Sequence, residues 1–335
     1  MLVHTIWSGG KLPPWALEGL ETIRKATPRH DHLLWAVPKE KGTSIKAPRW
    51  NTMQLSQLWL QDFKFLDPYD DDTLYDIIQF ELKYGGFSAI KDLLEFVVLY
   101  LYGGLYLDLS MRSLTSEDRG AAIQKTIPMS AWDPSTETSE VRLPQVDSGL
   151  LVARRVLSPS YELYVTDSAR DSTYRDMTTW DKRDNPHAAM GFPHLDVWAC
   201  YAKPQSTVMK NAAAFMISRY MTLVNSSLGT APSDQTITVP DNQRSRFTFT
   251  TVGRYTELGA KTSGAPEDKE YRNQIIGKTV MSAIYDALAA RYVDERTQQV
   301  PQSQWDGLIW KTAKADGGYA CPALGLTKLH KGSWR

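Results

Sequence analysis

Cysteine is scarce in this sequence of 335 residues, and net charge is absent. The two cysteines, Cys200 and Cys321, are too few for a disulfide framework, and their spacing is not that of a metal site. We expect both to be reduced residues of the core. The 38 basic and 38 acidic residues give a formal net charge of zero, without the excess of positive charge that attracts nucleic acids. We therefore expect no nucleic-acid partner.

Long hydrophobic runs and signal-type segments are also missing. The longest apolar run, residues 96–107, is too short to cross a membrane and contains two adjacent glycines. Met1 leads directly into a β-rich stretch, without the basic and apolar regions of a signal peptide. We expect no membrane span and a cytoplasmic location. No G-x-G-x-x-G follows the first predicted strand, which argues against a dinucleotide-dependent oxidoreductase.

The most informative stretch is residues 88–112, which read SAIKDLLEFVVLYLYGGLYLDLSMR. Residues 90–102 are mostly apolar and stop at Gly103-Gly104, which predicts a buried helix closed by a glycine in the left-handed conformation. Residues 105–107 then predict a central strand that is covered on both faces.

Polar residues follow this strand and interrupt the helix. Asp108 and Ser110 are two apart, so their side chains point to the same side, beyond the carboxyl end of the strand where ligands bind in open α/β sheets. Asp92 is placed in the first turn of the predicted helix, where the helix dipole favours an anion. One interpretation is structural, with Asp92 as a helix-start charge and Lys91 with Glu95 as an (i, i+4) surface pair. The other is that Asp92 and Asp108 belong to one site.

The segment KDLLEFVVLYLYGGLYLDLS resembles the DXD-motif region of sugar transferases, in which the pattern is SDILRxxxLxxxGGxYLDxD. That family includes yeast-type initiating mannosyltransferases, the glucosylating domains of large clostridial toxins and bacterial capsular polysaccharide synthesis proteins. The sequence departs from the pattern at Glu95, where Arg is usual, and at Ser110, where a second acid is usual. The capsule-synthesis branch is similar to this sequence, because it has Asp-x-Thr, with a hydroxyl residue at the position of Ser110.

The resemblance implies an α/β fold of the GT-A type, a Rossmann-like nucleotide-binding sheet with added helices and a C-terminal tail over the donor site. It implies one continuous domain in which residues 1–155 form the nucleotide-sugar-binding half. Residues 156–335 then form the acceptor-side half, with a helical region, a hairpin and a C-terminal closing segment.

The first predicted strand, residues 2–7, runs into the turn HTIWSGG. A glycine-rich turn after the first strand of an α/β sheet is where a nucleotide approaches the backbone. This turn resembles the opening of the same families, which implies that Trp7 stacks on the base and that Ser8 and Gly9 bind the donor, together with Tyr106. The alternative for Trp7 is a core residue that caps the sheet.

The other elements are predicted from local patterns and turn residues. They are strands over 32–37, 126–132 and 145–153, helices over 13–26, 53–65, 73–83 and 281–292, a polar helical region over 159–220 for the acceptor, and a hairpin over 232–251. The acidic turn over residues 67–72 is interpreted as the cap of the following helix rather than as a metal cluster.

The C-terminus, residues 330–335, reads HKGSWR and resembles the H-x-x-G-S-W that closes the yeast-type family. This implies that Ser333 and Trp334 fold over the donor phosphates. Taken alone, His330 would be a surface residue at a frayed end. Placed with Asp108 and Ser110, it would complete a site for Mn²⁺ or Mg²⁺.

The function implied is that of a retaining glycosyltransferase that moves a sugar from a UDP- or GDP-linked donor to a glycan or protein acceptor. Asp108 would hold the metal and a ribose hydroxyl, and Asp92 would accept hydrogen bonds from sugar hydroxyls. Asp147 lies in an Asp-Ser-Gly corner that resembles the N-N-G-x-[IM] element under the donor sugar, although it is equally an ordinary strand-start turn. The alternative function is that of an inactive GT-A fold that binds a nucleotide sugar or a glycan.

Overall fold

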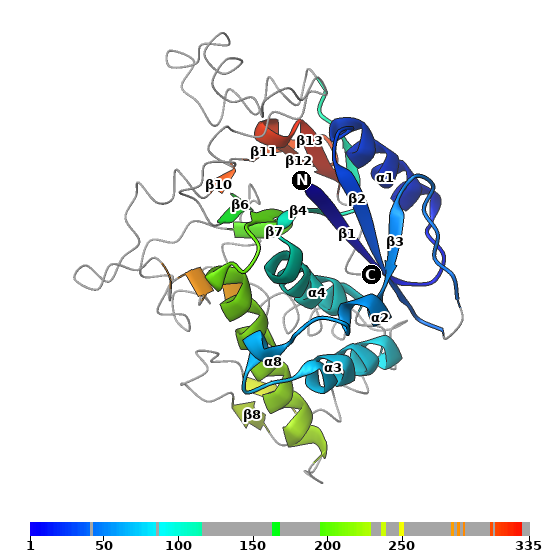
Figure 1. The fold of residues 1–335 in the computed structure, drawn as a ribbon. Helices are drawn as coiled ribbons and strands as arrows, with labels where there is room; N and C mark the ends of the chain where they lie inside the picture. Colours follow the sequence, from blue (N-terminus) through cyan, green and yellow to red (C-terminus); the bar gives the residue numbers. More distant parts are fainter. Residues whose placement is uncertain are drawn as a thin grey trace, which may run out of the picture.

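The computed structural model describes residues 1–40, 43–84, 87–115, 163–167, 195–228, 236–238, 248–250, 283–284, 287–288, 291, 309–310 and 312–329. Its main feature is a mixed sheet with the strand order β10-β6-β7-β4-β1-β2-β3 (Figure 1). The strands are β1 (Leu2–Gly9), β2 (Asp31–Pro38), β3 (Asn51–Gln54), β4 (Gly104–Leu107), β6 (Leu163–Asp167), β7 (Leu195–Ala202) and β10 (Ile309–Trp310).

The half of the sheet made by β3, β2, β1 and β4 is parallel, whereas β7 runs antiparallel to both β4 and β6. The order 3-2-1-4 is that of a nucleotide-binding Rossmann sheet. The chain reverses its direction of winding between β1 and β4, which makes this pair the topological switch point. The predicted α/β class with a Rossmann-like sheet is therefore confirmed.

Helices cover both faces of this parallel half because its strands carry apolar residues on both sides. α1 (Pro14–Ala26) packs on the face that contains Val3, and α4 (Phe87–Tyr102) packs on the face that contains Ile6. The predicted first helix and first strand are confirmed. Cys200 and Cys321 are free and buried, one in each of the two cores, as expected.

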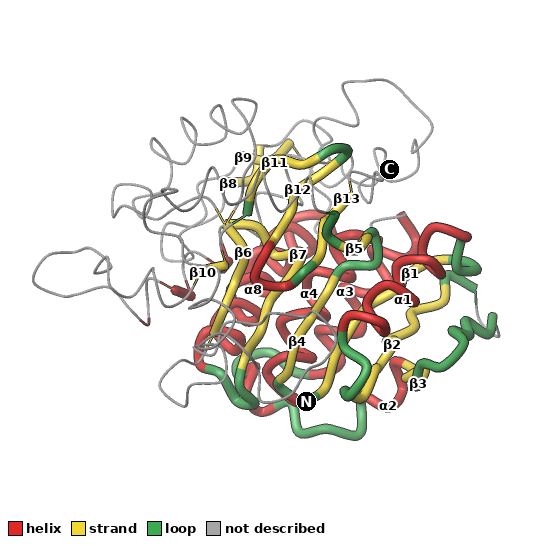
Figure 2. The backbone as a smooth tube through the Cα atoms, turned by 90° about the horizontal axis from the view of Figure 1, so that it is seen from above, coloured by secondary structure: helices red, strands yellow, loops and turns green. Residues whose placement is uncertain are grey.

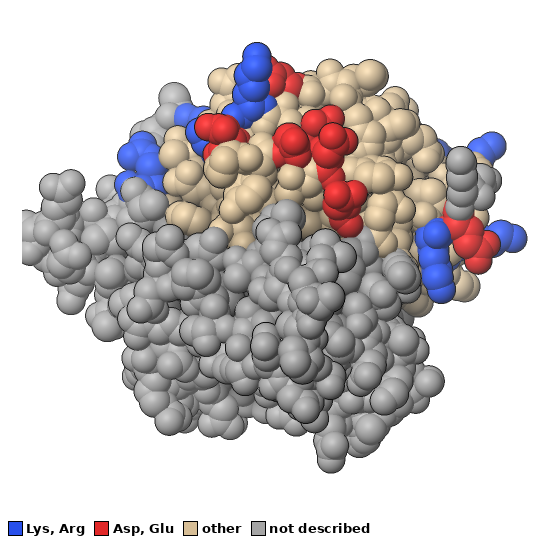
Figure 3. All heavy atoms as spheres, turned by 90° about the horizontal axis from the view of Figure 1, so that it is seen from below, with Lys and Arg blue, Asp and Glu red and all other residues tan. Residues whose placement is uncertain are grey.

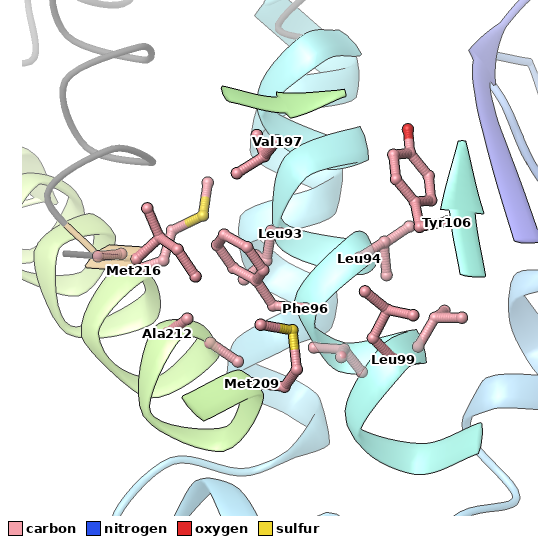
Figure 4. Packing of buried hydrophobic residues seen from close by; sticks show 14 of the residues in the cluster. Leu93, Leu94, Phe96, Leu99, Tyr106, Val197, Met209, Ala212 and Met216 are labelled. Carbon is pink, nitrogen blue, oxygen red and sulfur yellow. The ribbon is translucent and has the colours of Figure 1, made fainter. Parts of the chain in front are cut away.

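α4 is the most deeply buried helix of the part described. α8 (Thr207–Leu228) and α3 (Asp71–Tyr84) pack against it on the side away from the sheet. Figure 4 shows the packing of Leu93, Leu94, Phe96 and Leu99 of α4 with Tyr106 of β4, Val197 of β7 and Met209, Ala212 and Met216 of α8. The helix ends as predicted, since Gly103 has a φ of 61° and its N–H donates to the carbonyl of Leu99.

A second, antiparallel sheet lies beyond the carboxyl end of β4 (Figure 2). Its order is β11-β12-β13-β5, and its strands are β11 (Ala313–Ala315), β12 (Gly318–Cys321), β13 (Leu326–Leu329) and β5 (Met111–Ser113). Because β5 follows β4 after three residues, the C-terminal strand β13 is brought back to the end of the central strand. Both sheets thus combine strands from the two predicted halves of the chain.

Two of the predicted elements are wrong. Residues 53–65 do not form one helix but the end of β3, the single turn α2 (Leu55–Leu58) and the 3-10 turn η1 (Lys64–Leu66). Pairing of Met53 with Trp35 of β2 extends the sheet at its edge and removes the start of that helix. Within residues 159–220, the described part begins with β6 and β7 and becomes helical only in α8, because the run LDVWACYA fills the sheet between β4 and β6.

Other predictions are met in the described residues. The second strand is β2, and the hairpin over 232–251 is the antiparallel pair β8 (Thr236–Thr238) and β9 (Thr248–Thr250). Of the helix predicted over 281–292, the residues described are helical. The strands predicted over 126–132 and 145–153 lie outside the described residues.

The acidic turn caps α3, as predicted. Asp70 Oδ1 accepts hydrogen bonds from the backbone N–H and the hydroxyl of Thr73, at 2.8 and 2.7 Å. Figure 3 shows acidic side chains gathered on the face of the molecule seen from below. In the part of the chain that the structure describes, no helix combines the length and hydrophobicity needed to cross a membrane.

Candidate functional site

The candidate site lies where β4 ends, at the switch point of the sheet. Asp108 follows β4 directly, and its N–H donates to the carbonyl of Trp198 in β7, which extends the sheet by one residue. Tyr106 belongs to the core on the α4 face, while Leu107 and Leu109 belong to the core on the α1 face. Asp108 therefore points to the same side as Tyr106, toward α4, at the carboxyl end predicted from the sequence.

Three donors converge on the carboxylate of Asp108. Its Oδ1 accepts hydrogen bonds from the hydroxyl of Tyr106 at 2.8 Å and from Lys91 Nζ at 2.9 Å. Its Oδ2 is contacted by Nζ of Lys328. A carboxylate removed from water is costly unless it is paired and hydrogen-bonded, and here both oxygens are satisfied by protein groups.

Lys328 reaches the site because β13 pairs with β5. The register places Lys328 opposite Met111, and the N–H of Leu329 donates to the carbonyl of Ser110 at 2.8 Å. The ammonium of Lys328 also lies 2.6 Å from the hydroxyl oxygen of Ser110. A single lysine thus contacts both polar residues of the Asp-x-Ser motif.

Lys91 connects Asp108 to Asp92. Its ammonium lies 2.8 Å from Asp92 Oδ1, and Asp92 itself is 1 % exposed. Because α4 begins at Phe87, Asp92 is not in the first turn, and its interpretation as a helix-start charge is wrong. The interpretation of Lys91 and Glu95 as a surface pair is also wrong, since Glu95 is fully buried and its carboxyl oxygens have no hydrogen-bond partner among the described residues.

Burial and charge shift the pKa values of these groups in different directions. Burial alone would raise the pKa of Asp108, but the nearby ammonium groups outweigh it and hold the pKa well below its usual range. Burial raises the pKa of Asp92 to about 6, against the pull of Lys91. Burial also raises the pKa of Glu95 well above its ordinary value and favours the neutral acid. Burial opposes the charge of Lys91, yet the neighbouring carboxylates, chiefly Asp108, raise its pKa.

The described residues do not fit the divalent metal expected at Asp108 and Ser110. The oxygens that would serve as ligands already contact the ammonium groups of Lys91 and Lys328. An ammonium group and a divalent cation carry charge of the same sign, so both lysines would repel a metal ion placed at these oxygens. Among the residues described, no group of three or more His, Cys, Asp or Glu side chains could hold a metal ion.

The predicted donor-binding residues at the start of the chain lie at the same edge of the sheet, at the end of β1. Trp7 is partly buried, packs edge-on against Trp15 with ring centroids 5.8 Å apart, and donates from Nε1 to the carbonyl of Gly10. The hydroxyl of Ser8 donates to the carbonyl of Phe87 and ties β1 to the beginning of α4. Gly9 has a φ of 127° and faces open space. The fourth predicted donor-binding residue, Tyr106, is fully buried beneath Asp108.

Four predicted site residues, Asp147, His330, Ser333 and Trp334, lie outside the described residues. Conversely, two residues that the structure places in the site, Lys91 and Lys328, were not predicted to belong to it. Lys91 could have been suspected from its place beside Asp92 inside the motif. For Lys328 the sequence holds no local signal, because only the pairing of β13 with β5 brings it to Asp108.

Comparison with known proteins gives matches among solved structures only. No protein-family model matches the sequence, and no curated protein sequence matches it. The ligand-free glycosyltransferase domain from the YGT toxin is similar with a TM-score of 0.46 and 13% identity, covering 92% of this chain and 79% of that chain. The UDP-bound form of that domain has a TM-score of 0.44 and 13% identity, with 93% and 79% covered. The catalytic domain of alpha-toxin from Clostridium novyi has a TM-score of 0.45 and 12% identity, with 98% and 78% covered.

Proposed function

We propose that the chain is a glycosyltransferase of the GT-A type that uses a nucleotide-diphosphate sugar. The observation that carries this proposal is the position of Asp108 at the carboxyl end of β4, beside β1 at the switch point of the sheet. Open α/β sheets bind their ligands in this place. The same stretch resembles the DXD-motif region of the sugar transferases, from the buried helix through Gly103-Gly104 to Asp-x-Ser, with departures at Glu95 and Ser110.

The reaction proposed is transfer of the sugar with retention of configuration at its C1. The bond from C1 to the β-phosphate oxygen breaks and leaves its electron pair on that oxygen. The acceptor hydroxyl oxygen forms the new bond to C1, and its proton leaves with the nucleoside diphosphate. Negative charge therefore gathers on the diphosphate, and positive charge fixed beside it lowers the barrier.

The chain's own residues supply these interactions in the proposal. Trp7 stacks on the base, and Asp108 accepts a hydrogen bond from the ribose. Asp92 orients the sugar, while Ser333 and Trp334 close over the phosphates. The acceptor, a glycan or a protein, binds to the half of the chain that follows residue 155, and Asp147 lies under the donor sugar.

A second candidate function is a module that binds a nucleotide sugar without transferring it. It is favoured by the burial of Asp92, which is 1% exposed, because neither of its carboxylate oxygens is then open to a sugar. Slow hydrolysis of the donor separates the two functions, because a transferase without acceptor passes its sugar to water, whereas a binding module releases the donor unchanged.

The test is a screen of UDP- and GDP-linked sugars for hydrolysis and for a thermal shift, with Mn²⁺ and with EDTA. We expect at least one donor to be hydrolysed and to raise the melting temperature, since a ligand at a hundred times its dissociation constant adds about 2.7 kcal/mol of stability. Asp108→Asn should lower turnover at least about a hundredfold, the scale for one lost transition-state contact.

Asp76→Asn, an exposed substitution on α3, is the matched control and should keep full activity. A thermal shift without hydrolysis would favour the binding module. If no donor gave either response, the glycosyltransferase proposal would fail. Normal turnover by a folded Asp108→Asn protein would remove Asp108 from the reaction.

A further inference from the structure

Two lysines occupy the place where the resembled motif holds its metal. Lys328 contacts both Asp108 and Ser110, the positions of the paired acids in the DXD pattern. Lys91 approaches the other oxygen of Asp108 from α4 and lies 2.8 Å from Asp92. Both motif residues thus face ammonium groups that come from elements far apart in the chain.

The charges of the four side chains in direct contact sum as they would around a divalent ion. Lys91 and Lys328 carry two positive charges, and Asp92 and Asp108 carry two negative charges in their ionised forms, with Glu95 and Asp196 as further acids nearby. A divalent ion between two carboxylates gives the same sum of zero. The difference lies in position, because two ammonium groups distribute the positive charge over the two sides of Asp108.

Both lysine side chains are partly exposed and have an N–H hydrogen available for a ligand. The side chain of Lys91 is 16% exposed and that of Lys328 is 10% exposed, whereas Asp108 is 7% exposed. Each ammonium carries three hydrogens and contacts two acceptors within the cluster. One hydrogen of each is therefore left for an anionic oxygen outside the cluster.

We propose that Lys91 and Lys328 bind the diphosphate of the nucleotide donor in place of a divalent ion, so that the protein binds its donor without metal. This inference rests on the proposed glycosyltransferase function. Asp108 then holds the two ammonium groups in position rather than ligating a cation. The lysines neutralise the charge that gathers on the leaving diphosphate, which is the chemistry that a metal would otherwise supply.

The first experiment measures the affinity of the wild-type chain for UDP and for GDP by calorimetry, in EDTA and in Mn²⁺. We expect the nucleotide that binds to do so in EDTA with a dissociation constant within about tenfold of the value in Mn²⁺. Binding that weakens in EDTA by more than this overturns the metal-free site and leaves the proposed function standing. If neither nucleotide binds in either buffer, the proposed function fails, and this inference fails with it.

The second experiment tests the two lysines with Lys91→Met and Lys328→Met. Each substitution should raise the dissociation constant of the nucleotide that binds by at least about tenfold, which is the effect of losing one charge-assisted hydrogen bond. The matching nucleoside, which has no phosphate, should bind with unchanged affinity. If the lysines served folding alone, the substitutions would leave the ratio of the nucleotide affinity to the nucleoside affinity unchanged. That result would overturn the proposal.

Lys314→Met is the matched control, because Lys314 lies exposed on β11 of the same sheet as Lys328. It should leave both affinities unchanged. Lys328→Arg keeps the positive charge and serves if Lys328→Met does not fold. We expect it to bind the diphosphate in EDTA, and a requirement for Mn²⁺ in this variant would overturn the proposal as well.

Discussion

At the scale of single residues, His4 joins three parts of the main sheet. Its Nε2 lies 2.8 Å from the carbonyl oxygen of Gly103 and must donate, since a carbonyl only accepts. Its Nδ1 lies 3.2 Å from the indole Nε1 of Trp35 and must accept. The ring is therefore neutral. Burial lowers the pKa of His4 from 6.5 to about 4, opposed by the hydrogen bond to Gly103.

This pKa predicts that His4 contributes to a loss of stability in acid. Between pH 6.5 and about 4 the unfolded chain binds a proton at this residue and the folded chain does not, so stability falls as the pH falls through this window. The contribution is roughly 3 kcal/mol. It is measured by urea unfolding of the wild type and of His4→Gln, whose side chain does not titrate.

The free energy difference between these two proteins should shrink by that amount as the pH is lowered across the window. The comparison is needed because two buried acids, Asp92 and Glu95, act in the opposite direction. The raised pKa of Asp92 makes the folded chain bind the extra proton at this residue between about pH 4 and 6. A difference that stays constant with pH would contradict the neutral, buried state of His4.

Among the site residues, Asp108 could be predicted from the sequence, whereas the contact that Lys91 makes with it could not. An apolar run, two glycines and a short strand are local signals that place Asp108 at the binding edge of a sheet. Lys91 and Glu95 have the (i, i+4) spacing of an exposed pair. Instead, Glu95 is fully buried and Lys91 bonds to Asp108 at the end of β4, an arrangement that depends on how α4 packs on the sheet.

At the scale of elements, α1 lies directly against the segment that carries the site. Gly19 of α1 is buried, and a Cβ atom there would overlap the backbone carbonyl of Leu109, the residue after Asp108. We predict that Gly19→Ala lowers the free energy of unfolding by about 1–3 kcal/mol, the usual cost of overpacking. This loss outweighs the gain of up to about 1 kcal/mol in helix propensity.

Gly19→Ala should also lower turnover, because the strain is relieved by moving Leu109 and its neighbour Asp108. Thermal unfolding and donor hydrolysis measure the two effects. Glu18→Ala, at an exposed position of the same helix, should leave both unchanged. A stabilised Gly19→Ala protein would mean that α1 can move away from Leu109 without cost.

Elements with a strong local signal could be predicted, and those that depend on pairing could not. α1 begins at Pro14 after an extended Pro13, and Gly103 terminates α4. A single residue is therefore enough to predict each boundary. The edge strand β3 has no such signal. It exists because Met53 pairs with Trp35, and the apolar spacing around it equally suggests a helix.

At the scale of the whole molecule, the C-terminal strand holds the second sheet to the end of β4. β13 pairs with β12 on one side and with β5 on the other, and it buries Leu326. We predict that deletion of residues 326–335 lowers the free energy of unfolding by about 3 kcal/mol or more, since one fully buried leucine alone contributes about 1.5–3 kcal/mol.

Deletion of residues 331–335 alone should leave the melting temperature without ligand unchanged, because β13 ends at Leu329. We expect this shorter deletion to raise the Michaelis constant of the donor and to lower turnover together, as for the loss of a closing segment. Unfolding of the shorter variant would make the tail part of the core. Normal kinetics would remove Ser333 and Trp334 from the proposed donor site.

The contact between Asp108 and Lys328 also determines when during biosynthesis the cluster can exist. The two residues are 220 positions apart. A ribosome that adds about 5–20 residues per second needs roughly 10 to 45 seconds to travel from one codon to the other. Until then the nascent chain carries Asp108 with only one of its two lysine partners, so the complete pair of cations arises only when Lys328 has been made.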